Sequence, residues 1–277
     1  MSNISEQINR LIDYTHISTY DRESEINRLR LTQHVNPLAR YGKKCFSQVY
    51  EDGITIEIIE RIKRHLRSKF FLEIGSGNGH ENNTTIAAAL KWEGVWVDQC
   101  DLAYDLPESS RVKYYQQKVN KHTAVQLAKQ GLHDCGKEAY DMISIDVDGI
   151  DYYIIEELLN NELHPLFWIV EYNAQFPPPV EYIIDYDPDF TWDNSFNFGA
   201  SLQSINNLMQ SFGYMLVCCT PAAGTNAFYV SKELAYLFKD VPEHIGDIYV
   251  EPHYRLSINF GHNWSPAAVK KVLSKAD

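Results

Sequence analysis

Short apolar runs of β type alternate with helical patterns over residues 69–232, and this alternation constrains the fold more than any other feature. Helical patterns at about 83–92, 121–131, 151–161 and 200–211 separate most of these runs. Strands that alternate with helices predict an α/β fold with a doubly wound, mostly parallel sheet. The last two runs are joined by only PAAGT, too short for a parallel crossover, so we expect an antiparallel terminal hairpin. The seven strand candidates are 69–75, 94–99, 112–117, 140–147, 165–172, 213–220 and 226–232.

The chain of 277 residues is long enough for one large domain with appendages. Residues 1–68 carry apolar residues at helical spacing, of which the run from Ile54 to Leu66 is the strongest, and predict a helical N-terminal lid. We expect the ligand-binding domain to span 69–233. Residues 234–277 are expected to form a C-terminal extension packed on that domain.

The charge balance limits the partners. The formal net charge is -12, with 25 Lys+Arg against 37 Asp+Glu, whereas a nucleic-acid backbone demands a basic stripe, so we expect no nucleic-acid partner. No apolar run approaches the roughly 20 residues that span a bilayer, and the polar start MSNISEQINR does not resemble a signal peptide. We therefore expect a cytoplasmic protein without a membrane partner.

A glycine-rich turn follows the first strand candidate. Gly75, Gly77 and Gly79 stand in the segment Glu73-Ile-Gly-Ser-Gly-Asn-Gly, and a helix is expected to start near Asn83. Glycines allow a sharp turn and close approach to a ligand, and a helix N-terminus offers free N–H groups. The spacing is GxGxG, whereas the dinucleotide fingerprint is GxGxxG. The loop predicts a nucleoside cradle, although a plain tight turn is the alternative.

Two carboxylates refine the prediction. Glu73 precedes the glycines and is placed to act through the loop on an amino group, while Asp98 ends the second strand candidate, 98 - 75 = 23 residues after Gly75. A carboxylate about 20 residues on usually accepts from ribose hydroxyls. Asp101 is a rival for that role. The pattern describes an adenosine ligand without a pyrophosphate, which favours S-adenosylmethionine over a nicotinamide cofactor.

Together with the strand-end Asp and the terminal hairpin, the motif ExGxGxG resembles class I S-adenosylmethionine-dependent methyltransferases. Four segments, within a likeness that covers about residues 46–231, resemble the FkbM-like family more narrowly: Ser47-Gln48-Val-Tyr-Glu51-Asp52-Gly53-Ile54, the glycine loop with Asn83-Thr84, Ser144-Ile-Asp146-Val-Asp148-Gly149, and Val170-Glu171-Tyr172-Asn173. The resemblance implies O-methylation of a sugar, sugar nucleotide or related small metabolite. It also implies that the cofactor is held by Gln48, Glu51, Asp52, Glu73, Gly75, Gly77, Gly79, Asn83, Asp98 and Asp146.

Carboxylates follow the fourth and fifth strand candidates. Asp146 and Asp148 share one face because they are two residues apart, and Glu171 and Asn173 follow the next strand. The carboxyl ends of neighbouring strands meet where an open α/β sheet binds its ligands. These four residues form a candidate site for Mg²⁺ or another hard cation, which would help to deprotonate the acceptor hydroxyl.

A mechanism without metal is equally open. Asp148 or Glu171 would then serve as the general base, or a histidine would, with His122 among the candidates. The other candidate histidines are His80, His253 and His262. A lone histidine is more often a surface or core residue than a catalytic one.

A proline-interrupted segment after the fifth strand candidate is rich in aromatic residues. Three consecutive prolines, 177–179, exclude a central strand, so this segment must be a loop. Its rings could wall a pocket for a carbohydrate-like acceptor, or simply pack on the sheet. They are Tyr182, Tyr186, Phe190, Trp192, Phe196 and Phe198. A nicotinamide-dependent oxidoreductase and a non-catalytic nucleoside-binding module are the competing functions, and a homodimer formed through the N-terminal region is a further open possibility.

Overall fold

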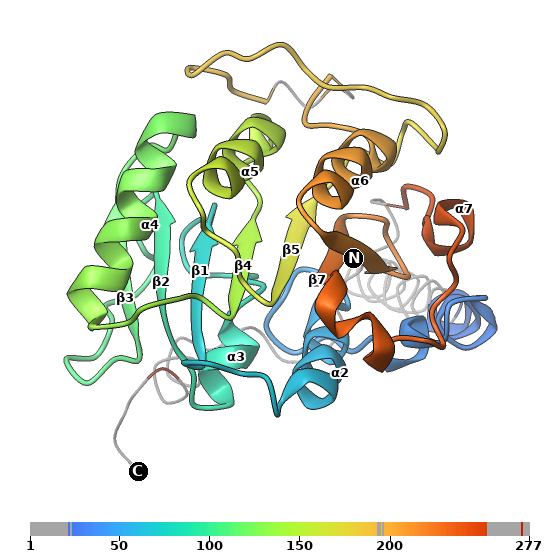
Figure 1. Cartoon of the computed structure of the whole chain (residues 1–277), viewed down its shortest axis with the longest axis horizontal. Helices are drawn as coiled ribbons and strands as arrows, with labels where there is room; N and C mark the ends of the chain where they lie inside the picture. Colours follow the sequence, from blue (N-terminus) through green and yellow to red (C-terminus); the bar gives the residue numbers. More distant parts are fainter. Residues whose placement is uncertain (1–21, 23, 193–194, 196, 254–272, 274–277) are drawn as a thin grey trace, which may run out of the picture.

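The sheet has seven strands in the order β3-β2-β1-β4-β5-β7-β6. It is seen in a computed structural model that describes residues 22, 24–192, 195, 197–253 and 273. The first five strands pair in parallel, and β7 runs antiparallel to both β5 and β6 (Figure 1). The predicted doubly wound, mostly parallel sheet with an antiparallel terminal hairpin is confirmed. The strands are β1 (Phe70–Ile74), β2 (Glu93–Asp98), β3 (Val112–Gln116), β4 (Met142–Ile145), β5 (Phe167–Glu171), β6 (Tyr214–Cys219) and β7 (Asn226–Ser231).

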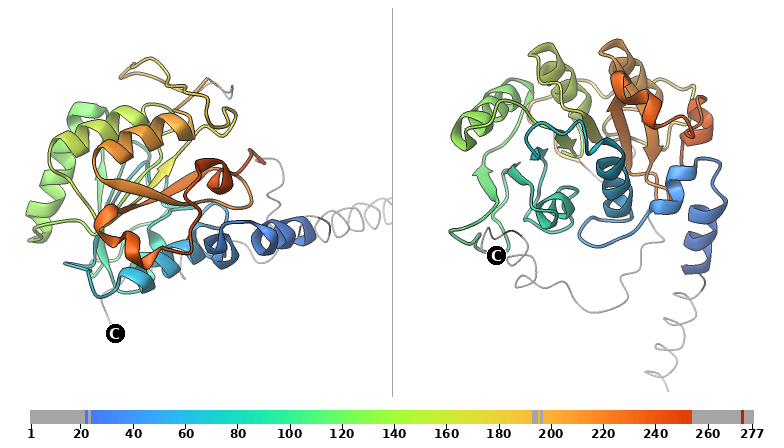
Figure 2. Two further views of the ribbon diagram at one scale, coloured as in Figure 1. Left: turned by 45° about the vertical axis from the view of Figure 1, so that its right-hand side comes forward. Right: turned by 60° about the horizontal axis from the view of Figure 1, so that its bottom comes forward.

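Helices cover both faces of the sheet. One face carries α4 (Lys121–Cys135), α5 (Asp151–Asn160) and α6 (Leu202–Ser211), and the other carries α2 (Glu51–Ile62) and α3 (Thr85–Ala89) (Figure 2). All four helices predicted between the strands are present. Each connects consecutive parallel strands or leads into the hairpin, so the carboxyl ends of β1, β2, β4 and β5 lie along one edge of the sheet.

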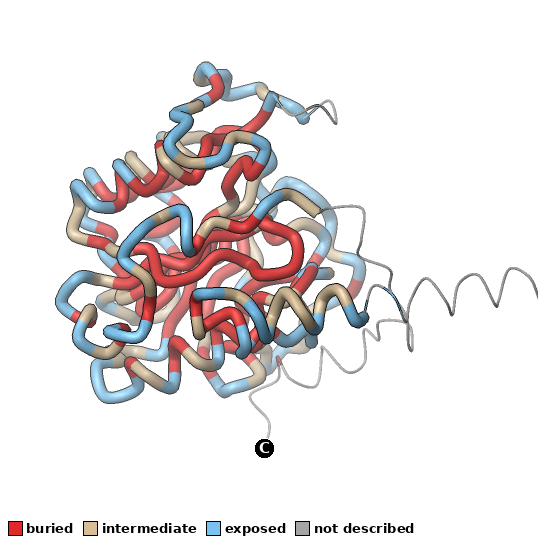
Figure 3. Tube along the Cα trace, turned by 90° about the vertical axis from the view of Figure 1, so that its right-hand side faces the viewer, coloured by how far each residue is buried: buried red, intermediate tan, exposed pale blue. Residues whose placement is uncertain are grey.

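The sequence explains why these elements form. Residues of β1, β4 and most of β5 are buried, and all but Glu73, Ser144 and Glu171 are apolar, as expected for strands covered on both faces. The edge strand β3 is largely accessible. Figure 3 shows the buried residues running through the middle of the molecule. Helix α4 begins with a capping box in which Asn120 and Thr123 satisfy each other's backbone N–H groups, and it ends at Gly136 in the left-handed region.

Helix α2 and short elements before and after the strands pack around the sheet. Helix α2 buries Ile54, Ile58 and Ile62 and exposes Ile56 on its outer face, as its helical spacing predicts. A short 3₁₀ turn, η1 (Pro37–Tyr41), precedes it, and η2 (Lys232–Leu237) and α7 (Ile245–Ile248) follow the hairpin. The division into 1–68, 69–233 and 234–277 stays a prediction. Among the described helices, none combines the length and the apolar character needed to cross a membrane.

Candidate functional site

The turn after β1 brings the backbone unusually close to the end of β4. Gly75 has φ +90°, and a Cβ built there would lie 1.6 Å from the carbonyl oxygen of Asp146. Only glycine tolerates both the conformation and the contact. The turn continues through Gly77, whose φ is +54° and whose N–H donates to Asp98 Oδ2 at 2.7 Å. The glycine loop is therefore fastened to the carboxyl end of β2.

Glu73 is buried beneath this loop and holds the start of α3. Its carboxylate accepts from the backbone N–H of Asn83 at 2.8 Å and of Thr84 at 3.2 Å, from the Asn82 amide at 3.3 Å and from the Thr84 hydroxyl. Burial raises the pKa of Glu73 to about 7, although these hydrogen bonds oppose the shift. Glu73 thus holds the start of α3 from behind the loop, and its action through the loop on an amino group stays a prediction.

Asp98 and Asp101, the two candidates for binding the ribose, differ in their contacts. Asp98 accepts from the N–H groups of Gly77 and Cys100, one at each carboxylate oxygen, and it lines the cavity in front of the loop. Asp101 instead accepts from the Gln116 amide and is exposed outside that cavity. The geometry favours Asp98.

The cavity has a volume of about 370 Å³ and lies at the carboxyl ends of β1, β2, β4 and β5. This volume is within the usual range of small-molecule sites. Seven of the residues predicted to hold a cofactor line it, namely Gln48, Glu73, Gly75, Gly77, Asn83, Asp98 and Asp146. Gly79 does not line the cavity; it turns with φ +85° against the Tyr104 ring.

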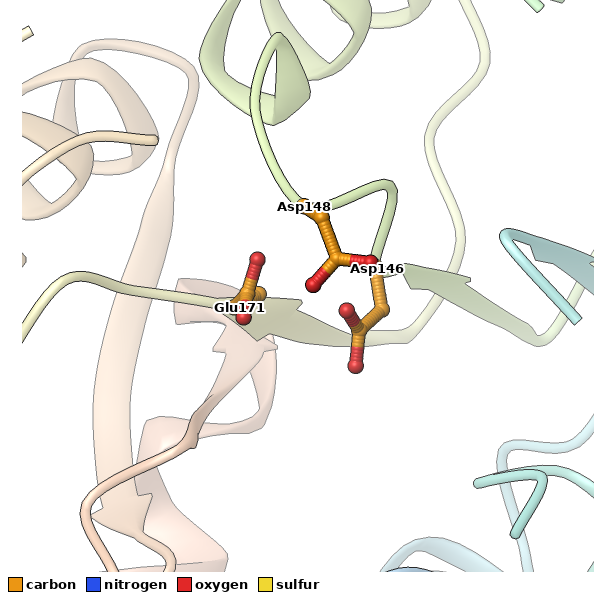
Figure 4. Close-up of side chains that lie close together, drawn as sticks. All are labelled: Asp146, Asp148 and Glu171. Atoms are coloured by element: carbon orange, nitrogen blue, oxygen red, sulfur yellow. The ribbon is translucent and has the colours of Figure 1, made fainter. Parts of the chain in front are cut away.

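Three carboxylates of the cavity lining converge. One oxygen each from Asp146, Asp148 and Glu171 lies within 4.8 Å of the others (Figure 4). Asp148 sits in the left-handed region at φ +56°, in a turn whose Val147 and Gly149 N–H groups donate to Asp151 at 2.8 and 2.9 Å. Asp151 therefore holds the turn that aims Asp148 at its neighbours.

The pKa values of these three carboxyl groups are raised, because the groups are buried close to one another and to other carboxylates. Burial, followed by repulsion from Asp151 and Asp148, raises the pKa of Asp146 well above its ordinary value, and burial with Asp146 does the same for Glu171. The pKa of Asp148 is raised by partial burial and by Asp98. One oxygen of Glu171, Oε2, is buried without a hydrogen-bond partner in the described part of the chain. Three carboxylates this close together are stable only when protons or a bound cation neutralise part of their negative charge.

Two residues assigned to the cofactor from the lid segment serve a different structural purpose. Glu51 Oε2 accepts from Val49 N–H at 2.9 Å, and its Oε1 accepts from side chains of the β6–β7 hairpin. Asp52 Oδ2 accepts from three successive N–H groups, residues 45–47, and from the Ser47 hydroxyl. Neither lines the cavity, whereas Gln48 does. Glu51 and Asp52 fix the segment that carries Gln48.

The structure does not bring His122 to this cavity. It is the second residue of α4, it is exposed, and its N–H donates to the Asn120 cap. His80 does line the cavity, beside the glycine loop and stacked against Tyr104 at 6.4 Å. His253 donates its N–H to Ala223 O and lies outside the cavity. His262 lies outside the described residues.

Asn173 is likewise engaged elsewhere. Its Nδ2 donates to Phe198 O at 2.9 Å and its Oδ1 accepts from Gln175 N–H at 3.1 Å, so its side chain holds the loop after β5. Among the cavity residues that the sequence did not predict is Asn226, the first residue of β7, which is buried. Its only sequence signal was a polar residue at the start of the apolar run 226–232.

The aromatic loop contributes one ring to the cavity. Phe190 lies against Gly149, where an added Cβ would come within 2.2 Å of the ring, and it lines the cavity beside Asp148. Phe176 and Tyr182 stack on each other, and Trp192 packs at an angle on Phe198. These contacts hold the loop rather than the cavity wall. Phe196 lies outside the described residues.

Comparison with known proteins yields only distant structural similarity. No family model matches the chain, and no curated protein matches it. The O-methyltransferase TomG of Streptomyces achromogenes, solved in complex with SAM and involved in tomaymycin synthesis, is similar over 73% of this chain and 89% of its own, with 12% identity and a TM-score of 0.37. An O-methyltransferase family protein of Burkholderia thailandensis is similar over 79% of this chain and 70% of its own, with 11% identity and a TM-score of 0.35. Similarity at this level does not extend to function, which depends on the residues described above.

Proposed function

We propose that this protein is an S-adenosylmethionine-dependent O-methyltransferase acting on a hydroxyl of a sugar, sugar nucleotide or related small metabolite. The observation that carries the proposal is a single cavity lined by the glycine loop, by Asp98 and by three converging carboxylates. We expect a nucleoside bound by the loop and Asp98 to direct its reactive group toward these carboxylates. The loop provides no third glycine at the GxGxxG position, which disfavours a nicotinamide cofactor.

The cofactor end offers complementary chemistry to S-adenosylmethionine. Asp98 lies where a ribose would need hydroxyl acceptors, and it is already oriented by two backbone N–H groups. Gln48 and Asn83 supply neutral donors and acceptors for an amino-acid tail. The surrounding carboxylates favour a sulfonium cation over an anionic pyrophosphate.

The acceptor end offers a base and an apolar wall. Asp148 is accessible, has a raised pKa and is aimed by Asp151, which suits a group that takes a proton from a hydroxyl. A divalent cation held by Asp146, Asp148 and Glu171 would lower the pKa of that hydroxyl and so make its deprotonation easier. Phe190 provides a flat ring on which the apolar face of a sugar can stack.

Calorimetry with S-adenosylhomocysteine tests the cofactor. We expect binding by the wild type and none by Gly77→Arg, because the new side chain would project from the loop into the cavity. Gly136→Arg is the matched control, since Gly136 also has a positive φ, +61° against +54°, and also faces open space, but at the far end of α4. Absence of wild-type binding, or equal effects of the two substitutions, would overturn the proposal.

Methyl-transfer assays against neutral monosaccharides and sugar nucleotides test the acceptor. Phe190→Ala should raise KM for the acceptor and leave S-adenosylhomocysteine affinity unchanged. Trp192→Ala is the control, because this ring is on the same loop but outside the cavity. Turnover that survives exhaustive chelation would leave the general-base mechanism and exclude the metal-assisted one.

A further inference from the structure

Asn226 is held in a single orientation at the base of the cavity. The residue is 1% exposed, and its Nδ2 donates to Glu51 Oε1 at 3.2 Å. The same Glu51 oxygen accepts from the hydroxyls of Thr220 at 3.1 Å and Thr225 at 3.0 Å. Because this Glu51 oxygen accepts all three hydrogen bonds, the amide turns its nitrogen toward Glu51. Its oxygen, Oδ1, is therefore directed away from Glu51.

That oxygen has no partner among the residues described. Asn226 Oδ1 is buried and receives no hydrogen bond, although the residue lines the cavity. Buried amide oxygens are almost always satisfied, because leaving one without a donor costs free energy. The backbone of Asn226 is fully used in the hairpin, where its N–H donates to the Thr220 hydroxyl and its C=O accepts from Thr220 N–H. The unsatisfied oxygen is a property of the side chain alone.

Asn226 lies directly opposite Glu171 in the β5–β7 pairing. Directly paired residues on antiparallel strands project from the same face of the sheet, with Cβ atoms about 4.5–5.5 Å apart. Glu171 Oε2 is also buried and without a partner. Two buried acceptors therefore stand side by side, with no donor between them in the described chain.

The neighbouring groups indicate what belongs there. Asp146 and Asp148 each bring an oxygen within 4.8 Å of Glu171, so the complete set is three carboxylates and one amide oxygen. An all-oxygen set of this kind suits a hard divalent cation. We propose that Asn226 Oδ1 is the fourth protein ligand of a divalent-cation site formed with Asp146, Asp148 and Glu171. This assignment rests on the metal-assisted form of the proposed function and replaces Asn173, whose amide is already engaged.

Titration with Mn²⁺, followed by electron paramagnetic resonance of the free ion, tests the assignment without any activity. Asn226→Leu should weaken Mn²⁺ binding at least tenfold, because it removes Oδ1 at similar volume. Thr225→Val is the matched control: it removes another hydrogen bond to Glu51 Oε1 but no cavity group. We expect it to change Mn²⁺ affinity less than twofold. Equal losses in both variants would assign the effect to Glu51 and overturn the proposal.

Crystals of the wild-type protein soaked in Mn²⁺ provide a test that does not depend on a variant folding. The anomalous signal of manganese should place the ion about 2.0–2.6 Å from Asn226 Oδ1 and from the three carboxylates, as expected for oxygen ligands of hard cations. An ion that bypasses Asn226, or no ion at saturating Mn²⁺, would overturn the assignment. Calorimetry with S-adenosylhomocysteine separates the two ideas, since cofactor binding without a Mn²⁺ site would leave the methyltransferase proposal standing.

Discussion

Replacement of Glu73 by glutamine should reduce the pH dependence of stability by a measurable amount. The pKa of Glu73 is about 7 in the folded protein, against the ordinary value of 4.5 that we take for the unfolded chain. The folded state therefore binds the Glu73 proton more tightly than the unfolded state does. Stability from this group is therefore fully present below pH 4.5 and is lost as the pH rises through 7. Integrated from pH 5 to pH 8, the loss is roughly 2–3 kcal/mol in the free energy of unfolding.

Urea unfolding of the cofactor-free protein at pH 5, 6, 7 and 8 measures this quantity. Tryptophan fluorescence is a suitable probe, because Trp92, Trp96 and Trp168 are fully buried. Glutamine does not titrate, so Glu73→Gln should show a pH-dependent loss that is smaller than the wild type's by roughly 2–3 kcal/mol. Groups that do not interact with Glu73 act alike in both proteins and cancel in the difference. Asp146, whose pKa is partly raised by Glu73, also loses less in the variant and so adds to the difference.

The control is Glu108→Gln, which makes the same change of charge at an exposed position. It should reproduce the wild-type pH dependence. The reasoning is refuted if Glu73→Gln and the wild type lose the same free energy between pH 5 and pH 8. That result would mean that the four hydrogen bonds from Asn82, Asn83 and Thr84 fully compensate the burial of the carboxylate.

Three further outcomes are expected. Gly75→Ala should destabilise the fold by more than about 3 kcal/mol in urea unfolding, because the new Cβ would clash with Asp146 O. Gly213→Ala, also at positive φ but in open space, should cost only about 1 kcal/mol. Equal costs for the two variants would contradict the steric argument. Asp98→Asn should weaken S-adenosylhomocysteine binding about tenfold, or about 1.4 kcal/mol by calorimetry, and an unchanged affinity would remove Asp98 from the ribose role. Glu171→Gln should abolish the rise in Tm that Mn²⁺ gives the wild type, and a retained rise would place the cation elsewhere.

The fold was predictable because its signals are local. The inner strands consist mostly of apolar residues, and strand burial on both faces makes such runs conspicuous. The five-residue link before β7 was enough to predict an antiparallel hairpin. Its place between β5 and β6 follows from long-range pairing of Glu171 with Asn226, for which the sequence carries no local signal.

The candidate site was predictable only where function and local geometry coincide. Asp146 and Asp148 were expected on one face of a strand, but β4 ends at Ile145 and Asp148 lies in a turn at φ +56°. The two carboxylates meet Glu171 because of this turn, which Asp151 holds, and not because of strand alternation. Glu51 and Asp52 were assigned to the cofactor, although their carboxylates hold backbone N–H groups and hairpin side chains. Sequence spacing cannot separate a carboxylate that braces a loop from one that faces a ligand, because both follow the same motif. Only the hydrogen-bond partners distinguish them.

The position of β7 also has a consequence for synthesis of the protein on the ribosome. The outer edge of β5 has no partner until β7 is made, about 55 residues later in the chain. At typical translation rates of roughly 5–20 residues per second, this interval lasts roughly 3–11 s. During that time the nascent chain exposes an unpaired strand edge, a known hazard for aggregation. Glu51 also lacks its hydrogen bonds to Thr220, Thr225 and Asn226 until then. A chain released early would therefore have neither the complete sheet nor the contacts that hold Glu51 beside the cavity residue Asn226.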